Sequence, residues 1–148
     1  MRRIGRARGE RCRMHDLPLS PEDRGKLLHV VRSQPPRDRL LAEMVYGHGL
    51  DLGEALSVRA EEIAWGEERV KLAAHGARGV RRTVTAERET VEGILGSRRH
   101  GPLFATASGV PIRIDYAVRL LGRVAEAAGV PSGLSVKRVR SRRLAGAR

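Results

Sequence analysis

Cysteine is nearly absent from this sequence, and metal-ligand patterns are correspondingly poor. Cys12 is the only cysteine among 148 residues, which excludes an intramolecular disulfide and any cysteine-rich zinc or iron–sulfur site. Cys12 and His15 stand at short spacing, but no second Cys/His pair completes a tetrahedral site with them. We therefore expect neither a bound metal nor a cofactor.

Long hydrophobic runs are also missing. No apolar stretch approaches the length of a membrane span, and the arginine-rich segment 1–13 lacks the apolar run of a signal peptide. Charged residues make up 31% and hydrophobic residues 41% of the chain, so it fits neither a low-charge membrane protein nor a disordered one. We expect one cytoplasmic domain with no membrane partner.

Acidic residues are few relative to basic ones. Seventeen Asp and Glu oppose 29 Lys and Arg, giving a formal charge of +12 and an isoelectric point near 11.4. Such an excess indicates a polyanionic partner, with nucleic acid as the first candidate, although coding bias toward arginine and alanine gives the same composition. Charge favours affinity for DNA without specifying any chemistry.

The chain divides into a short basic arm and one domain. Residues 1–16 carry six arginines and few apolar residues, which predicts a flexible arm that touches phosphates or is a leftover interdomain linker. Residues 17–148 form the domain. Ser20 as N-cap and Pro21 at the first helical position predict the first helix of this domain.

The remaining pattern predicts a mainly α, α+β domain with helices around a small β-hairpin. Gly129 ends the most regular helix, and Trp65 is expected to close a small core. Helices are predicted over 37–46, over the first part of 50–65, over 87–95 and after Ser135, and a hairpin is predicted over 69–85. A further helix is predicted from the apolar stripe Ile114, Val118, Leu121, Ala125 and Ala128.

A family resemblance rests on several of these segments in order. The stretch 37–41, the segment Tyr46-Gly47-His48-Gly49-Leu50, and the run 54–65 resemble the first motif region of tyrosine recombinases, the phage integrase family. A hairpin, the segment 101–104, a long helix and a basic helix follow in the same order. The resemblance covers about residues 17–145 and implies a catalytic-domain fold that cuts DNA through a phosphotyrosine.

The resemblance also implies site residues, two of which depart from the family pattern. The first catalytic arginine of the family follows a Gly-Leu pair, whereas Asp51 follows Gly49-Leu50 here and replaces a phosphate-binding cation with an anion. Asp51 is alternatively a helix cap. The family's hairpin lysine acts as general acid, but the turn here has only Arg78, with Lys71 earlier on the strand. An exposed charge on the hairpin is an equally good interpretation of Arg78.

The second family motif is present, and the nucleophile is not. Lys137 and Arg140 match the box of His or Lys followed three residues later by Arg, a spacing that places both on one helical face. Eight residues follow Arg140, so the resemblance implies a truncated domain that lacks the C-terminal helices and their tyrosine. Tyr46 and Tyr116 match no nucleophile position and are expected to pack with solvated hydroxyls.

These features suggest a DNA-binding recombinase fragment that does not cleave DNA alone, with duplex DNA, an intact recombinase or other copies of itself as partners. An alternative is a small basic regulatory protein unrelated to recombinases, whose last helix enters a groove. A third is an enzyme completed by a tyrosine from another chain. If the C-terminal helices are missing, Leu121 and Leu144 are expected to be exposed.

Overall fold

The computed structural model describes residues 20–130, and the predicted α+β, mainly α class is confirmed. Helices predominate, and the three strands form one small antiparallel sheet. In chain order the elements are α2 (Pro21–Val31), α3 (Pro36–Ala42), the π-helical turn η1 (Glu43–Gly47), α4 (Leu52–Leu56), the 3-10 turn η2 (Ala60–Glu62), β2 (Ala64–Trp65), β3 (Arg69–His75), the 3-10 turn η3 (Ala77–Gly79), β4 (Arg81–Glu87), α5 (Arg88–Leu95) and α6 (Ile114–Ala128).

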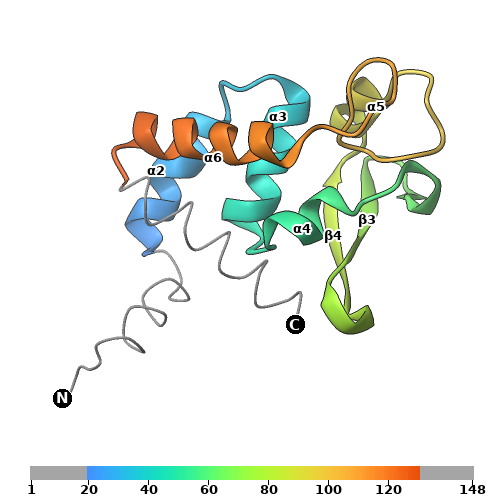
Figure 1. Cartoon of the computed structure of the whole chain (residues 1–148), viewed down its shortest axis with the longest axis horizontal. Helices are drawn as coiled ribbons and strands as arrows, with labels where there is room; N and C mark the ends of the chain where they lie inside the picture. The colour runs from blue at the N-terminus through green and yellow to red at the C-terminus, as the bar shows by residue number, and fades with distance from the viewer. Residues whose placement is uncertain (1–19, 131–148) are drawn as a thin grey trace.

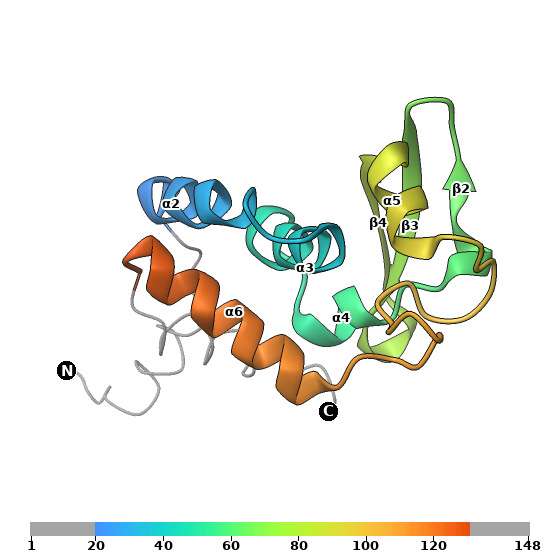
Figure 2. The same ribbon diagram turned by 90° about the horizontal axis from the view of Figure 1, so that it is seen from above.

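The elements separate into a helical part and a sheet part. Helix α6 packs along α2 on one side of the helical part, and α5 packs against β3 and β4 (Figures 1 and 2). Short helix α4 lies between the two parts and contacts β3. None of the helices in residues 20–130 combines the length and apolar character needed to cross a bilayer.

The first two helices begin as their local sequences predict. The Ser20 hydroxyl accepts the Asp23 amide at 3.1 Å, and Pro21 follows at a position that needs no hydrogen-bond donor. The segment predicted as one helix over 37–46 is α3 continued by η1, where the backbone widens. Within that turn the His48 amide donates to the Glu43 carbonyl at 3.1 Å.

The predicted hairpin is present, with one more strand beside it. Strands β3 and β4 pair antiparallel from Arg69↔Glu87 to His75↔Arg81. Strand β2 adds two residues to the outer edge of β3. Two residues are too short for a detectable alternation of apolar and polar side chains, so the sequence pattern did not predict β2.

Helix α6 confirms the predicted helix and corrects its buried face. Gly129 takes the left-handed conformation (φ 77°) that ends the helix, and the Val130 amide donates to the Ala125 carbonyl at 3.0 Å. Ile114, Val118 and Ala128 of the predicted stripe are only half-buried. The buried residues are Ala117, Leu120, Leu121, Val124 and Ala125.

One hydrophobic core joins the helices to the sheet and corrects two expectations. Phe104 and Leu121 are each 1% exposed, so Leu121 is not left open to solvent. Trp65 does not close the core, because its ring is 41% exposed and lies on edge strand β2. The Arg88 guanidinium stacks over that ring at 5.4 Å. Leu144 lies outside the described residues.

Candidate functional site

Asp51 is the N-cap of helix α4, at the position where the family resemblance implies an arginine. Gly49 adopts φ 75° just before it, and Leu50 is buried. The Asp51 carboxylate accepts the Glu54 amide at 2.8 Å, while the Glu54 carboxylate accepts the Asp51 amide at 3.0 Å. This reciprocal pair is a capping box, so the prediction of Asp51 as a helix cap is confirmed.

Glu54 ties this helix start to the hairpin. Glu54 is 5% exposed, and its second carboxylate oxygen, Oε2, lies 3.3 Å from Arg82 Nε of β4. A Cβ atom on Gly76, at the neck of the hairpin, would stand 2.9 Å from the same oxygen. A larger residue at position 76 would therefore require the Glu54 carboxylate to shift. One buried carboxylate holds both the start of α4 and the strand beside it.

Ser57 provides a second link between α4 and the hairpin. Its hydroxyl donates to the Glu54 carbonyl at 2.7 Å and accepts the His75 amide at 2.7 Å. The His75 ring then pairs with Glu62 through Nε2 and Oε1 at 2.9 Å. The neck of the hairpin is thus fixed by polar contacts on both sides of the strand end.

Arg78 occupies the exposed tip of this hairpin, away from the Asp51–Glu54 pair. It is in the left-handed conformation (φ 63°), the one residue other than glycine with a positive φ within residues 20–130. It makes no ion pair or hydrogen bond with another described side chain. The prediction of an exposed hairpin charge therefore fits Arg78, and Arg82 is the hairpin cation that reaches Glu54.

The loop before Leu103 is anchored by an exposed ion pair. Arg59 Nε donates to Glu61 Oε2 at 2.8 Å, and the Gly101 amide donates to Glu61 Oε1 at 2.8 Å. The hydrogen bond from Arg59, together with bonds from backbone amides, lowers the pKa of Glu61 to about 2. The same pairing raises the pKa of Arg59.

Both tyrosines are engaged in the fold, which corrects the expectation that their hydroxyls are solvated. Tyr46 is 3% exposed, and its hydroxyl donates to the Leu121 carbonyl at 2.9 Å. The Tyr116 hydroxyl donates to Asp38 Oδ2 at 2.6 Å. Arg37 donates to the same hydroxyl at 3.2 Å and lies over the Tyr116 ring at 5.3 Å. This network fixes α6 against α3.

The predicted site is therefore only partly assembled in residues 20–130. The structure brings Asp51 to Glu54 and Arg82, and it places Arg78 at a separate, exposed tip. Lys137, Arg140 and the arm 1–16 lie outside the described residues. Within residues 20–130, no three His, Cys, Asp or Glu side chains gather in a way that could hold a metal ion.

Glu54 and Arg82 were not singled out from the sequence as functional residues. The signal for Glu54 was available, since an acidic residue three positions after an Asp is the pattern of a capping box. Arg82 carried no such signal, because several arginines of the hairpin have equivalent strand positions. At the start of α4, the Asp51 and Glu54 carboxylates accept the Glu54 and Asp51 amides, so these two amides are not available to an external anion.

The comparisons with known proteins agree with the resemblance seen in the sequence. The chain is 30% identical to tyrosine recombinase XerC of Rhodospirillum centenum over 128 residues, which covers 77% of this chain and 37% of that protein. No protein-family model matches the sequence. The chain spans 37% of the length of this XerC recombinase, which is well under half.

Solved structures show the same likeness in three dimensions. A pre-cleavage complex of the XerH site-specific recombinase with its difH substrate matches with a TM-score of 0.59 and 18% identity, over 82% of this chain and 40% of that one. A post-cleavage complex of XerH with palindromic difH matches with a TM-score of 0.60 and 18% identity, over 83% and 40%. The resemblance predicted from the sequence is confirmed at the level of the fold.

Proposed function

Because the chain has a tyrosine recombinase fold, we propose that it is a recombinase-derived module that binds duplex DNA and does not cleave it by itself. The observation that carries this proposal is the capping box between Asp51 and Glu54. It stands where the family pattern has its first catalytic arginine. The XerH structures that share the fold are complexes with DNA substrates, which supports duplex DNA as the partner.

The absence of cleavage follows from the charges at the start of α4. Catalysis of phosphoryl transfer needs cationic donors aimed at the oxygens where negative charge develops. Asp51 supplies an anion there, and its carboxylate is already committed to the Glu54 amide. The tyrosines of the sequence, Tyr46 and Tyr116, both donate their hydroxyl protons within the fold. These hydrogen bonds support the proposal that neither hydroxyl acts as a nucleophile.

DNA binding is proposed through the exposed tip of the hairpin and the basic segment near the C-terminal end of the sequence. Arg78 and Arg81 are exposed at the tip and have no acidic partner within residues 20–130. Lys137 and Arg140 match the second family box and are proposed as further phosphate ligands. Arginine suits this role because its planar fork donates two hydrogen bonds and stays charged at any relevant pH.

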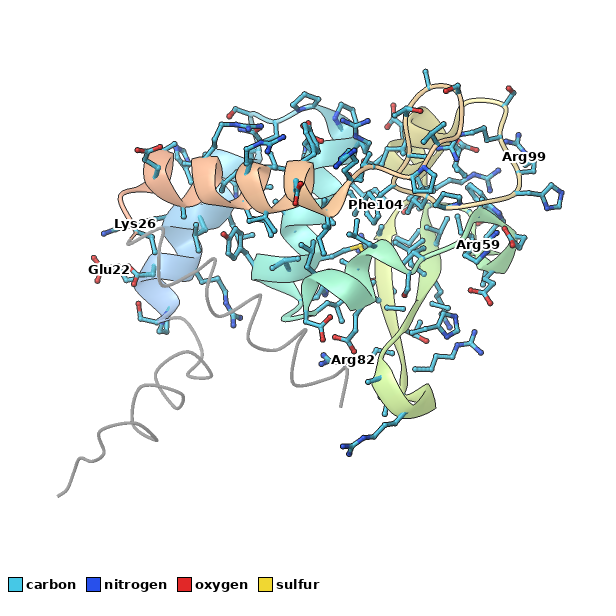
Figure 3. All side chains as sticks on the ribbon, viewed as in Figure 1. Glu22, Lys26, Arg59, Arg82, Arg99 and Phe104 are labelled. Atoms are coloured by element: carbon cyan, nitrogen blue, oxygen red, sulfur yellow. The ribbon has the colours of Figure 1, made fainter. Side chains whose placement is uncertain are left out.

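Fluorescence anisotropy with a labelled duplex tests the hairpin contact. The variants Arg78→Gln and Arg81→Gln are each expected to lower affinity and to reduce the slope of log K against log salt concentration by about one. Arg99→Gln is the matched control, because Arg99 is exposed in the loop after α5, at the end of the sheet away from the hairpin tip (Figure 3). Equal losses in all three variants would contradict the proposal and leave only the net charge as the source of affinity.

The same titration tests the family box. Arg140→Ala is expected to reduce duplex affinity by the worth of one phosphate contact, again with a slope smaller by about one. Lys137→Gln is expected to act in the same direction. An unchanged slope for Arg140→Ala removes that residue from the DNA-binding surface without affecting the argument for the hairpin.

The proposed partners include an intact recombinase, which would supply the missing chemistry at a shared recombination site. Mixing the chain with an intact recombinase on duplex DNA is expected to place both proteins on the DNA. Cleavage should then occur only in the active sites of the intact enzyme. A cleavage product assigned to this chain's own site would contradict the proposal and indicate a tyrosine donated by the partner.

A further inference from the structure

A polar groove of about 390 Å³ lies between the helical part and the sheet part of the domain. Residues from α2, α3, η1, β3, β4 and α5 contribute to its walls. It is separate from the hairpin tip, because Arg69 pairs with Glu87 at one end of the strands and His75 with Arg81 at the other. Six residue steps along a strand correspond to about 20 Å.

Cationic side chains from different elements converge on this groove. Its ionisable lining residues are Arg32, Arg39, His48 and Arg69, together with Glu43 and Glu87. Arg32 follows α2, His48 follows η1, and Arg69 begins β3. Three arginines against two glutamates leave an excess of one positive charge before His48 is counted.

Two of the three arginines that line the groove have no carboxylate partner among residues 20–130. Arg39 already pairs with Glu43 at 3.2 Å. Arg69 donates to the Thr85 hydroxyl at 3.3 Å, and Glu87 accepts the Thr90 hydroxyl at 3.4 Å. No carboxylate within residues 20–130 forms an ion pair with Arg32 or Arg69. These two guanidinium groups therefore keep donors for an external anion.

We propose that this groove binds a single phosphate group, through Arg32 and Arg69 with His48 beside them. A tetrahedral phosphate presents acceptor oxygens in several directions, which matches donors that arrive from separate elements better than a planar carboxylate does. The excess of one positive charge, before His48 is counted, fits one phosphate group.

The phosphate group has two sources, a free phosphate monoester or a phosphodiester in the backbone of a duplex. Three titrations of the ¹⁵N-labelled 148-residue chain, followed by NMR, separate them: inorganic phosphate, adenosine monophosphate, and a short duplex. Inorganic phosphate is expected to shift the amides of Arg32, His48 and Arg69 in a saturable way. Arg32→Gln and Arg69→Gln are each expected to weaken phosphate binding about tenfold, as loss of a charged hydrogen bond predicts.

The control variant is Arg113→Gln, whose side chain is 85% exposed and which does not line the groove. It is expected to leave the phosphate titration unchanged. Tighter binding of the monophosphate than of inorganic phosphate, with no competition from the duplex, identifies a free phosphate monoester as the ligand. Displacement of phosphate by the duplex identifies the DNA backbone.

Two results would overturn the inference. The first is a phosphate response that does not saturate or that spreads equally over all exposed arginines. The second is an equal loss of phosphate binding in Arg32→Gln and in Arg113→Gln. Both results concern the groove alone, so the test is independent of DNA binding by the hairpin, which Arg78→Gln and Arg81→Gln examine separately.

Discussion

Asp51 and Glu54 cap each other's backbone amides at 2.8 and 3.0 Å, and this mutual pairing defines the start of α4. The same Glu54 carboxylate reaches Arg82 of β4 at 3.3 Å. An acidic residue at position 51 is therefore built into the local fold. A substitution that introduces a cation there removes a helix cap.

The first prediction concerns that exchange. Asp51→Arg is expected to tighten duplex binding, because a carboxylate that repels phosphate becomes a cation that binds it. It is also expected to lower the free energy of unfolding by about 1 kcal/mol, because the cap is lost. Anisotropy and urea unfolding measure the two effects.

Asp51→Asn is the matched control for this prediction. Asparagine caps a helix about as well as aspartate, so stability should change little. Removal of the negative charge alone should still improve duplex affinity slightly. Weaker duplex binding by Asp51→Arg than by the wild type would show that position 51 does not face DNA.

The second prediction separates the two tyrosines. Tyr116→Phe is expected to lower the free energy of unfolding by about 1–3 kcal/mol, because the buried Asp38 carboxylate loses the Tyr116 hydroxyl at 2.6 Å and keeps the longer contact from Arg37 at 3.3 Å. Tyr46→Phe should cost about 1 kcal/mol, since the Leu121 carbonyl lies within α6 and keeps its helical partner. Urea unfolding of both variants gives the comparison. A larger loss for Tyr46→Phe contradicts the assignment of Asp38 as the critical acceptor.

The third prediction is a dependence of stability on pH. The pKa of Glu61 falls from 4.5 to about 2 on folding, so its ionised form stabilises the folded state. That contribution is fully present above about pH 4.5 and is lost as the pH falls toward 2. Comparing Glu61→Gln with the wild type by urea unfolding should show a difference at neutral pH that shrinks over this interval. A difference independent of pH contradicts the ion pair with Arg59.

The fourth prediction concerns the segment that closes the core. Phe104 is 1% exposed and lies between Leu103, which is fully buried, and Ala105, which accepts Arg37. Phe104→Ala is expected to cost about 3–5 kcal/mol through lost burial and a residual cavity. Val110→Ala, at 57% exposure, is the control and should change stability by less than about 0.5 kcal/mol. Similar losses in both variants would contradict the position of Phe104 in the core.

The helix signals and the hairpin could be predicted from local sequence, because caps and apolar spacing act over a few residues. Ser20 and Gly129 both mark helix ends where the sequence placed them. The prediction for Trp65 was wrong, because a large apolar side chain two residues after Ile63 gives no sign of lying on a sheet edge. Only the pairing of β2 with β3 reveals that position.

The candidate site was predictable to a smaller extent. Asp51 as a helix cap follows from its residue type and from Glu54 three positions later. The contact between Glu54 and Arg82 joins residues 28 positions apart in sequence and depends on how the hairpin packs on α4. The bonds of Tyr116 to Asp38 are of the same long-range kind. Such partners are set by tertiary packing, which a local pattern does not contain.

The most direct test of binding without cleavage is a denaturing-gel assay for a covalent protein–DNA adduct, run on a nicked duplex. The DNA concentration is chosen where anisotropy shows saturation, so that the chain is known to be bound. We predict no adduct for the 148-residue chain and none for Asp51→Arg, because Tyr46 and Tyr116 are both held within the fold. An adduct that survives denaturation would contradict this account and would identify one of these tyrosines as a nucleophile.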